Sequence, residues 1–122
     1  MKQAVTTLFE TLGGAPAIRA VVTDFYTRVL ADDNLKGFFK NTDMDRQREQ
    51  QIAFVTMALD GPNDYNGRPM KEAHEGMGIT GFHFDQVAGH LADALKHAGV
   101  SDALVGEVLA RVGPLKDVIV NA

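Results

Sequence analysis

Apolar residues recur along most of this chain at intervals of three and four positions, the spacing that puts them on one face of an α-helix. The clearest stripe follows Pro16, a residue suited to the first turn of a helix. No stretch keeps up an alternation of apolar and polar residues, so we expect an all-α protein without a β-sheet. The three longest stripes consist of Ile18, Val21, Val22, Phe25 and Val29; of Phe84, Val87, Ala88, Leu91, Leu95 and Ala98; and of Leu104, Val105, Val108, Leu109, Val112, Leu115 and Ile119.

Capping and helix-breaking residues separate the stripes. Thr7 and Glu10 have the spacing of a capping box at the start of a short first helix. Ser101 is placed to cap the last helix. Pro114 should kink that helix, because proline cannot donate a backbone hydrogen bond.

The segment Leu35–Phe39 is apolar but contains a glycine, so we interpret it as a tight helical corner rather than a strand. Phe38 and Phe39 are adjacent and cannot both face the same core. We therefore expect one of them to face a cavity or a bound ring.

Another helix is predicted from Thr42–Asp45, whose acidic residues suit a helix N-terminus, to about Leu59. Gln47 and Gln51 are one turn apart and in line with its apolar residues, although buried amides cost free energy unless they are paired. Either Gln47 lies at the core edge and Gln51 bonds locally, or both line a cavity that holds a polar ligand. The predicted inner face consists of Met44, Gln47, Gln51, Phe54, Val55 and Ala58.

The segment Pro69–Ile79 offers a short helix in which Met70, Ala73 and Met77 share an apolar face bordered by His74. So short a helix needs packing partners. An imidazole beside soft apolar side chains suggests a metal-bearing cofactor. The alternative is a histidine at the core edge that is hydrogen-bonded to the backbone.

Gly76–Gly81 matches the Gly-x-Gly-x-x-Gly dinucleotide fingerprint, but that motif needs a preceding strand and a βαβ unit, and helical patterns flank it here. His83, His90 and His97 are two helical turns apart, about 10 Å per step, whereas nitrogen ligands bind metals at about 2 Å. We expect these three on a flank of their helix, which leaves His74 as the best single metal ligand. One protein ligand can hold an iron that four porphyrin nitrogens already bind.

The composition of the chain excludes several classes of protein and site. The 122 residues suit one domain, 1–122, and the net charge of −4 provides no basic footprint for nucleic acid. Cysteine is absent, which excludes disulfides, thiolate catalysis and cysteine-ligated metal sites. We expect no membrane span and, since the first residues lack an apolar core of signal-peptide length, a cytoplasmic protein.

Many short pieces, in their order and spacing, give nearly the whole chain a specific resemblance to the truncated haemoglobins of the group I branch. The pieces are Leu12-Gly13-Gly14; Asp24-Phe25-Tyr26 with Val29-Leu30-Ala31-Asp32; Phe38-Phe39; Thr42-Asp43-Met44; Gln47 with Gln51; Gly61-Pro62 with Tyr65-Asn66-Gly67; Met70-Lys71-Glu72-Ala73-His74; and Ile79 with His83-Phe84. The resemblance implies a truncated globin whose helices stack two-on-two around haem b.

The resemblance also implies roles for single residues. His74 resembles the proximal iron ligand, and Tyr26, Gln47 and Gln51 resemble the polar trio around a bound gas (O2, NO or CO). The other implied haem-side residues are Phe39, stacked beside the haem; Phe54, lining or gating an apolar gas tunnel; Lys71, Tyr65 and, less directly, Arg46 on the propionate side; and the apolar contacts Met70, Met77, Ile79 and Phe84.

The chain departs from the branch in several places. Asp60-Gly61 stands where members commonly carry paired glycines. Gln50 leaves the distal helix without a histidine that could bind iron, so we expect the ligand position to be open or water-filled. We expect neither tunnel regulation by an N-terminal extension nor a covalent haem link from the last helix, which contains no histidine.

Two functional hypotheses follow. Tight O2 binding with slow release suits NO dioxygenation to nitrate, which would need an external electron donor or reductase because no flavin or nicotinamide domain fits in the chain. The alternative is reversible O2 storage, transport or sensing, by a monomer or weak dimer in either case. A cofactor-free helical interaction module would leave Gln47 and Gln51 unexplained.

Overall fold

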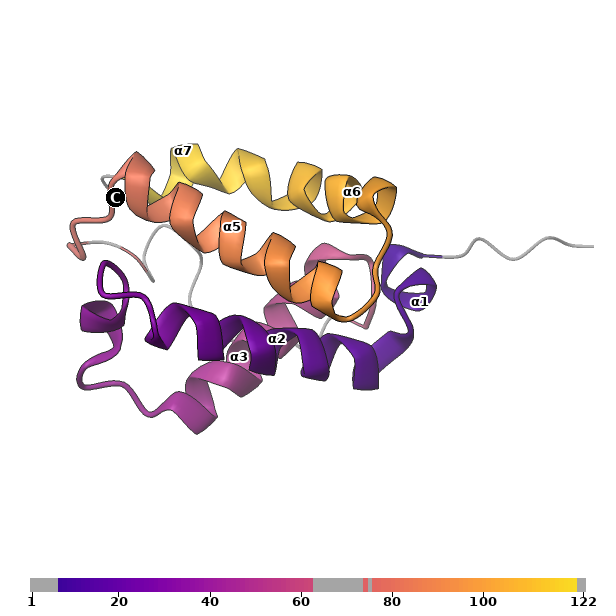
Figure 1. Ribbon diagram of the computed structural model, residues 1–122, viewed down its shortest axis with the longest axis horizontal. Coiled ribbons are helices and arrows are strands. Elements are labelled where there is room, and N and C mark those ends of the chain that lie inside the picture. The colour runs from indigo at the N-terminus through magenta and orange to yellow at the C-terminus, as the bar shows by residue number, and fades with distance from the viewer. Residues whose placement is uncertain (1–6, 63–73, 75, 121–122) are drawn as a thin grey trace, which may run out of the picture.

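Helix α2 (Gly14–Leu30) packs against two long helices, α3 (Met44–Ala58) and α5 (Gly81–His97), and α5 packs in turn against α6 (Asp102–Val112). In Figure 1, α5 and α6 form an upper layer over α2 and α3, which is the two-on-two arrangement that the resemblance implied. The computed structural model describes residues 7–62, 74 and 76–120. Every regular element within these ranges is helical, as the hydrophobic pattern predicted.

The short elements are α1 (Leu8–Thr11) before α2, the 3-10 turn η1 (Lys36–Phe39) between α2 and α3, and, after α6, the 3-10 turn η2 (Gly113–Leu115) and α7 (Lys116–Ile119). The predicted caps form, because the Thr7 hydroxyl accepts from the Glu10 backbone N–H at 3.1 Å and the Ser101 hydroxyl from that of Leu104 at 3.3 Å. Pro114 lies in η2, which interrupts the last helix at the predicted kink.

Helix α3 ends in a turn that uses a non-glycine residue in the left-handed region. Asp60 has φ 67°, and the next N–H, of Gly61, reaches back to the Thr56 carbonyl at 2.8 Å. Arg111 of α6 binds the Asp60 carboxylate at 2.9 Å and the Ala58 carbonyl at 3.1 Å. Asp60 therefore adopts a glycine-like conformation at the position where the resemblance led us to expect glycine, and a side chain from α6 holds it.

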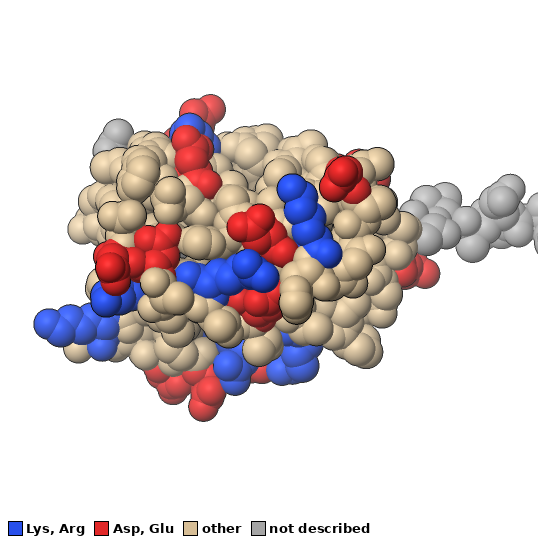
Figure 2. Space-filling view, viewed as in Figure 1, with Lys and Arg blue, Asp and Glu red and all other residues tan. Residues whose placement is uncertain are grey.

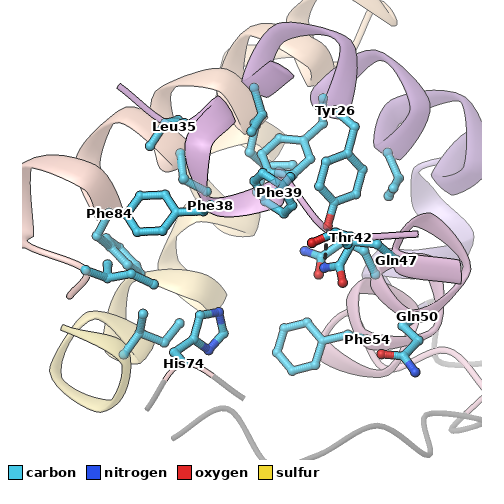
Figure 3. Close-up of a pocket in the computed structure, with 18 of the residues that line it drawn as sticks. Tyr26, Leu35, Phe38, Phe39, Thr42, Gln47, Gln50, Phe54, His74 and Phe84 are labelled. Carbon is cyan, nitrogen blue, oxygen red and sulfur yellow. Dashed lines mark hydrogen bonds between the residues drawn. The ribbon is translucent and has the colours of Figure 1, made fainter. Parts of the chain in front are cut away.

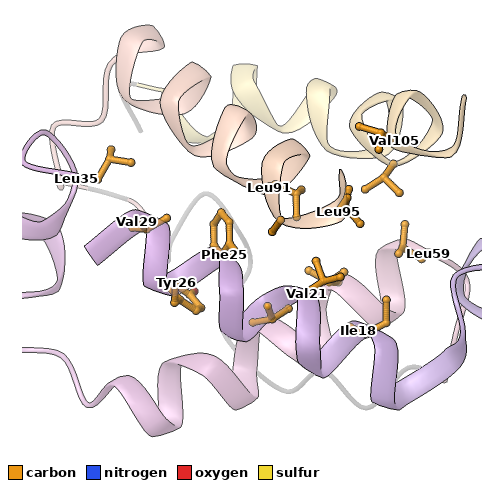
Figure 4. Packing of buried hydrophobic residues seen from close by; sticks show 14 residues of the cluster. Ile18, Val21, Phe25, Tyr26, Val29, Leu35, Leu59, Leu91, Leu95 and Val105 are labelled. Carbon is orange, nitrogen blue, oxygen red and sulfur yellow. The ribbon is translucent and has the colours of Figure 1, made fainter. Parts of the chain in front are cut away.

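Most of the core lies between α2, α5 and α6, and Val55 and Leu59 at the end of α3 and Leu35 before η1 complete it (Figure 4). The whole predicted stripe of α2 is buried, with Ile18, Val22 and Val29 each 1% exposed. In α5 the middle of the predicted apolar stripe is buried, but the prediction is wrong for its last residue. Ala98 is exposed there, because it caps the helix and the chain turns away at Gly99, which has φ 89°.

Charged side chains of both signs are interleaved over the face shown in Figure 2. One bidentate pair, between Arg19 of α2 and Glu49 of α3 at 2.6 Å and 2.9 Å, crosses the interface of the two helices. Within the described ranges, no helix has the length and apolar character that crossing a membrane requires.

Candidate functional site

A cavity of about 760 Å³ lies between α2, η1, α3, α5 and the last turns of the C-terminal helices. Cofactor and small-molecule sites typically measure about 300–1,000 Å³. Most of the wall is aliphatic or aromatic. The polar side chains in it are Tyr26, Thr42, Asp43, Arg46, Gln47, Gln50, Gln51, His74 and His83.

Tyr26 and Gln47 form a hydrogen-bonded pair in this wall (Figure 3). The Gln47 Nε2 donates to the Tyr26 hydroxyl oxygen at 3.0 Å. Burial raises the pKa of Tyr26 to about 12, and the hydrogen bond from Gln47 offsets only part of that rise. The phenol therefore stays protonated, and because its oxygen accepts from Gln47, its own proton is left to donate into the cavity.

Gln51 lines the cavity one turn after Gln47 on α3. Within the described ranges its amide makes no hydrogen bond, so it can donate to or accept from a bound molecule. Of the two interpretations of the glutamines, the geometry therefore agrees with the one in which both face a cavity. Arg46 and Gln50, on the same helix, add polar groups to the wall, and Gln50 is labelled at the edge of the close-up in Figure 3.

His74 lies across the cavity from the Tyr26–Gln47 pair (Figure 3). Its imidazole thus faces a space that has apolar walls on most sides and hydrogen-bond donors on the far side. Among the described residues, no cluster of three or more histidine or acidic side chains could hold a bare metal ion. A single imidazole opposite a donor set fits a metal held by a macrocycle better than it fits a free ion.

Phe38 and Phe39 of η1 both line the cavity and both pack against the core, so the premise that they cannot face the same core is wrong, while the expectation that one faces a cavity holds. In a 3-10 turn, successive residues point about 120° apart, so neighbours can reach one cavity from different sides. The Phe39 ring meets Tyr26 edge-on with a centroid separation of 5.8 Å, and the Phe38 ring meets His83 edge-on at 5.0 Å.

The three spaced histidines of α5 have separate surroundings. His83 lies in the cavity wall, where its Nδ1 accepts from the Thr80 backbone N–H at 3.1 Å and completes a capping box. The proton of the neutral His83 ring is therefore on Nε2. His90 binds Asp32 at 2.8 Å, and His97 is exposed. The prediction that the three share no metal agrees with this placement.

Most of the predicted site residues share the one cavity, while Tyr65, Met70 and Lys71 lie outside the described residues. Met77 lines the cavity although it is 36% exposed. The members of the shared set are Tyr26, Phe39, Gln47, Gln51, Phe54, His74, Met77, Ile79 and Phe84. Sequence reasoning placed several further lining residues in the helical core stripes instead, namely Val87, Ala88, Val112, Leu115 and Ile119.

Known proteins resemble the chain in sequence and structure. The sequence matches the bacterial-like globin family over residues 7–121. It is 48% identical over 114 residues to the group 1 truncated hemoglobin GlbN of Mycolicibacterium paratuberculosis, covering 93% of this chain and 84% of that protein. It is 52% identical over 101 residues to the group 1 truncated hemoglobin of Tetrahymena pyriformis, covering 83% of this chain and 84% of that protein.

Solved structures of truncated hemoglobins also resemble the chain. The crystal structure of truncated hemoglobin from Tetrahymena pyriformis, Fe(III) form, has a TM-score of 0.94 at 45% identity, covering 96% of this chain and 100% of that one. The 2/2 hemoglobin of a Synechococcus species, in the cyanomet state with covalently attached heme, has a TM-score of 0.89 at 39% identity, with the same coverage.

Proposed function

This chain belongs to the group 1 truncated haemoglobins, haem globins that bind diatomic ligands, and from that premise we propose that it converts NO and O2 to nitrate. The observation that carries the proposal is the pairing of a protonated Tyr26 with Gln47, opposite His74 and beside Gln51, whose amide makes no hydrogen bond to the described residues. These groups form a donor set aimed at the space where a gas would bind.

We propose haem b as the cofactor, with His74 as its iron ligand. The apolar walls, the single imidazole and the cavity volume support this assignment. Phe39, Met77, Ile79 and Phe84 would contact the ring, and Phe54 would line the route of the gas. Arg46 together with Lys71 and Tyr65, which lie outside the described residues, would meet its carboxylates.

When bound, haem supplies the site for the gas and one electron, so that O2, NO and that electron give nitrate. The chain's own part is to hold the first gas long enough for the second to arrive. Tyr26 donates through its hydroxyl proton and Gln51 through its amide, while Gln47 fixes the direction of the Tyr26 hydroxyl. Hydrogen bonds to charged groups contribute about 1.5–3 kcal/mol each, enough to slow ligand release markedly.

The electron would come from a separate reductase, and we propose a cytoplasmic monomer or weak dimer consisting of one globin domain, 1–122. Size-exclusion chromatography with light scattering tests the oligomeric state.

The nitrate yield tests the catalytic proposal. The hemin-loaded protein is reduced, supplied with O2 and a flavin reductase, and exposed to a sustained NO flow. We expect several nitrates per haem, fewer for Tyr26→Phe, and none above background for the protein without hemin. A yield that stops at one nitrate per haem while the reductase is turning over would favour reversible storage, transport or sensing instead.

A further inference from the structure

Asp32 ties together the corner between α2 and η1. Its carbonyl accepts from the backbone N–H groups of Leu35 at 3.0 Å and Lys36 at 2.9 Å. Its carboxylate Oδ1 accepts from the Asn34 N–H at 2.9 Å. One residue therefore sets the backbone path that leads into η1.

The second carboxylate oxygen of Asp32 joins this corner to α5. His90 Nε2 lies 2.8 Å from Asp32 Oδ2, and the two side chains are only 22% and 11% exposed. The hydrogen bond with His90 is the main cause that lowers the pKa of Asp32, so the carboxylate is ionised and His90 Nε2 is the donor. Neither residue lines the cavity.

The corner held in this way carries an aromatic wall of the cavity (Figure 3). Leu35 is 1% exposed and anchors the corner in the core. Phe39 presents its ring to Tyr26 at an interplanar angle of 80°, and Tyr26 in turn bonds Gln47. A shift of the corner would remove the side support of the Tyr26 ring without touching the hydroxyl itself.

We propose that His90 is a positioning residue: by holding Asp32 it fixes the corner, so that Phe39 keeps the Tyr26 hydroxyl aimed at the bound gas. The proposal rests on the proposed role of Tyr26 as a donor. It adds a residue of α5 that lies outside the cavity, where α5 meets the end of α2, to those that determine ligand release.

Two variants differing by one methylene test the proposal in the hemin-loaded protein. In His90→Gln the amide nitrogen can replace Nε2 and reach Asp32, whereas in His90→Asn it is too short. His97→Asn, at an exposed histidine of the same helix, is the matched control. We expect His90→Asn to raise the O2 dissociation rate about twofold to thirtyfold, the range for changes that act through packed side chains, and the other two to stay within about twofold of the wild type.

A second measurement reports the tyrosine ring directly. The chain has 2 tyrosines, so fluorotyrosine labelling gives two ¹⁹F resonances, which Tyr26→Phe assigns. His90→Asn should shift the Tyr26 resonance, and His90→Gln should not. If both variants behave like the wild type, or if both change alike, His90 does not position Tyr26.

Tyr26→Phe separates the two proposals. If it leaves the O2 dissociation rate unchanged, the donor role of Tyr26 is wrong, and the ¹⁹F shift alone decides whether His90 holds the ring. If Tyr26→Phe raises the rate but His90→Asn leaves both readouts unchanged, only the positioning role is overturned. Should His90→Asn fail to take up hemin, Asp32→Asn, which keeps one acceptor oxygen, replaces it with the same expected direction.

Discussion

The hydrogen bond between Gln47 and Tyr26 has a direction, and that direction determines what the cavity offers a ligand. Gln47 gives its amide proton to the phenol oxygen, so the phenol proton remains available. Tyr26→Phe removes this donor and keeps the ring. We expect the O2 dissociation rate to rise about tenfold to a hundredfold, since the lost bond is worth about 1.5–3 kcal/mol and each 1.4 kcal/mol is a factor of ten.

Stopped-flow displacement of O2 by CO measures this rate, with Thr27→Val, which removes an exposed hydroxyl from the same helix, as the control.

The O2 dissociation rate should also be insensitive to pH up to about pH 10, the ordinary phenol pKa, and should rise only towards the Tyr26 pKa of about 12. The raised pKa of Tyr26 also predicts how the free energy of unfolding depends on pH. Because the pKa of Tyr26 is higher in the folded protein than in the unfolded chain, its contribution to the free energy of unfolding is complete below about pH 10. That contribution is lost as the pH rises through about 12. An unchanged rate in Tyr26→Phe would contradict the donor role.

At the scale of elements, local signals account for what the sequence predicts well. The α2 stripe and the Thr7 and Ser101 caps depend on residues within a turn or two, so spacing alone reveals them. The premise that the adjacent Phe38 and Phe39 cannot both face the same core is wrong, because neighbours in a 3-10 turn point about 120° apart and can reach one region from different sides. The pairing of His90 with Asp32 joins positions 58 residues apart, and no local pattern marks it.

Helix interiors also offer a matched stability test. Gly89 of α5 and Gly106 of α6 are exposed, and a Cβ added at either would meet nothing within 4 Å. Alanine is favoured over glycine in helices, so Gly89→Ala and Gly106→Ala should each raise the free energy of unfolding by about 0.5–1 kcal/mol.

The matched change at the end of α3 should have the opposite sign. A Cβ on Gly61 would lie 2.7 Å from side-chain atoms of both Phe9 and Thr56. Gly61→Ala should therefore cost about 1–3 kcal/mol, the range for overpacking. Urea unfolding of the hemin-loaded variants compares all three, and equal stability of Gly61→Ala and Gly89→Ala would show that the α3 turn yields without cost.

At the scale of the whole molecule, helical periodicity cannot separate a core from a cavity. Val87, Leu115 and Ile119 fall in the same stripes as true core residues, yet they line the large cavity. Both kinds of position face inward and differ only in what lies opposite, which the sequence of one helix does not contain. The resemblance to group I truncated haemoglobins supplied that missing information, because it implied a ring between the helices.

The same cavity links folding to the cofactor. A cavity of about 760 Å³ that no ligand fills leaves the apolar side chains of its wall without packing partners, which costs free energy. Water entering through the polar wall reduces this cost but cannot remove it, since most of the lining is apolar. The chain without haem should therefore collapse around the site or lose part of its structure there.

We accordingly expect the haem-free protein to lose tertiary order in η1 and α3, which build the wall, while the core between α2, α5 and α6 persists. Adding hemin should raise the melting temperature by mass action, in proportion to the logarithm of its concentration over Kd. Hydrogen exchange with and without hemin measures which elements gain protection. His74→Ala should weaken both effects and the Soret absorption, whereas His97→Ala, an exposed histidine outside the cavity, should leave them intact. If His74→Ala takes up hemin and gains the same protection as the wild type, the ring is held by its apolar walls alone, and the imidazole is not what anchors it.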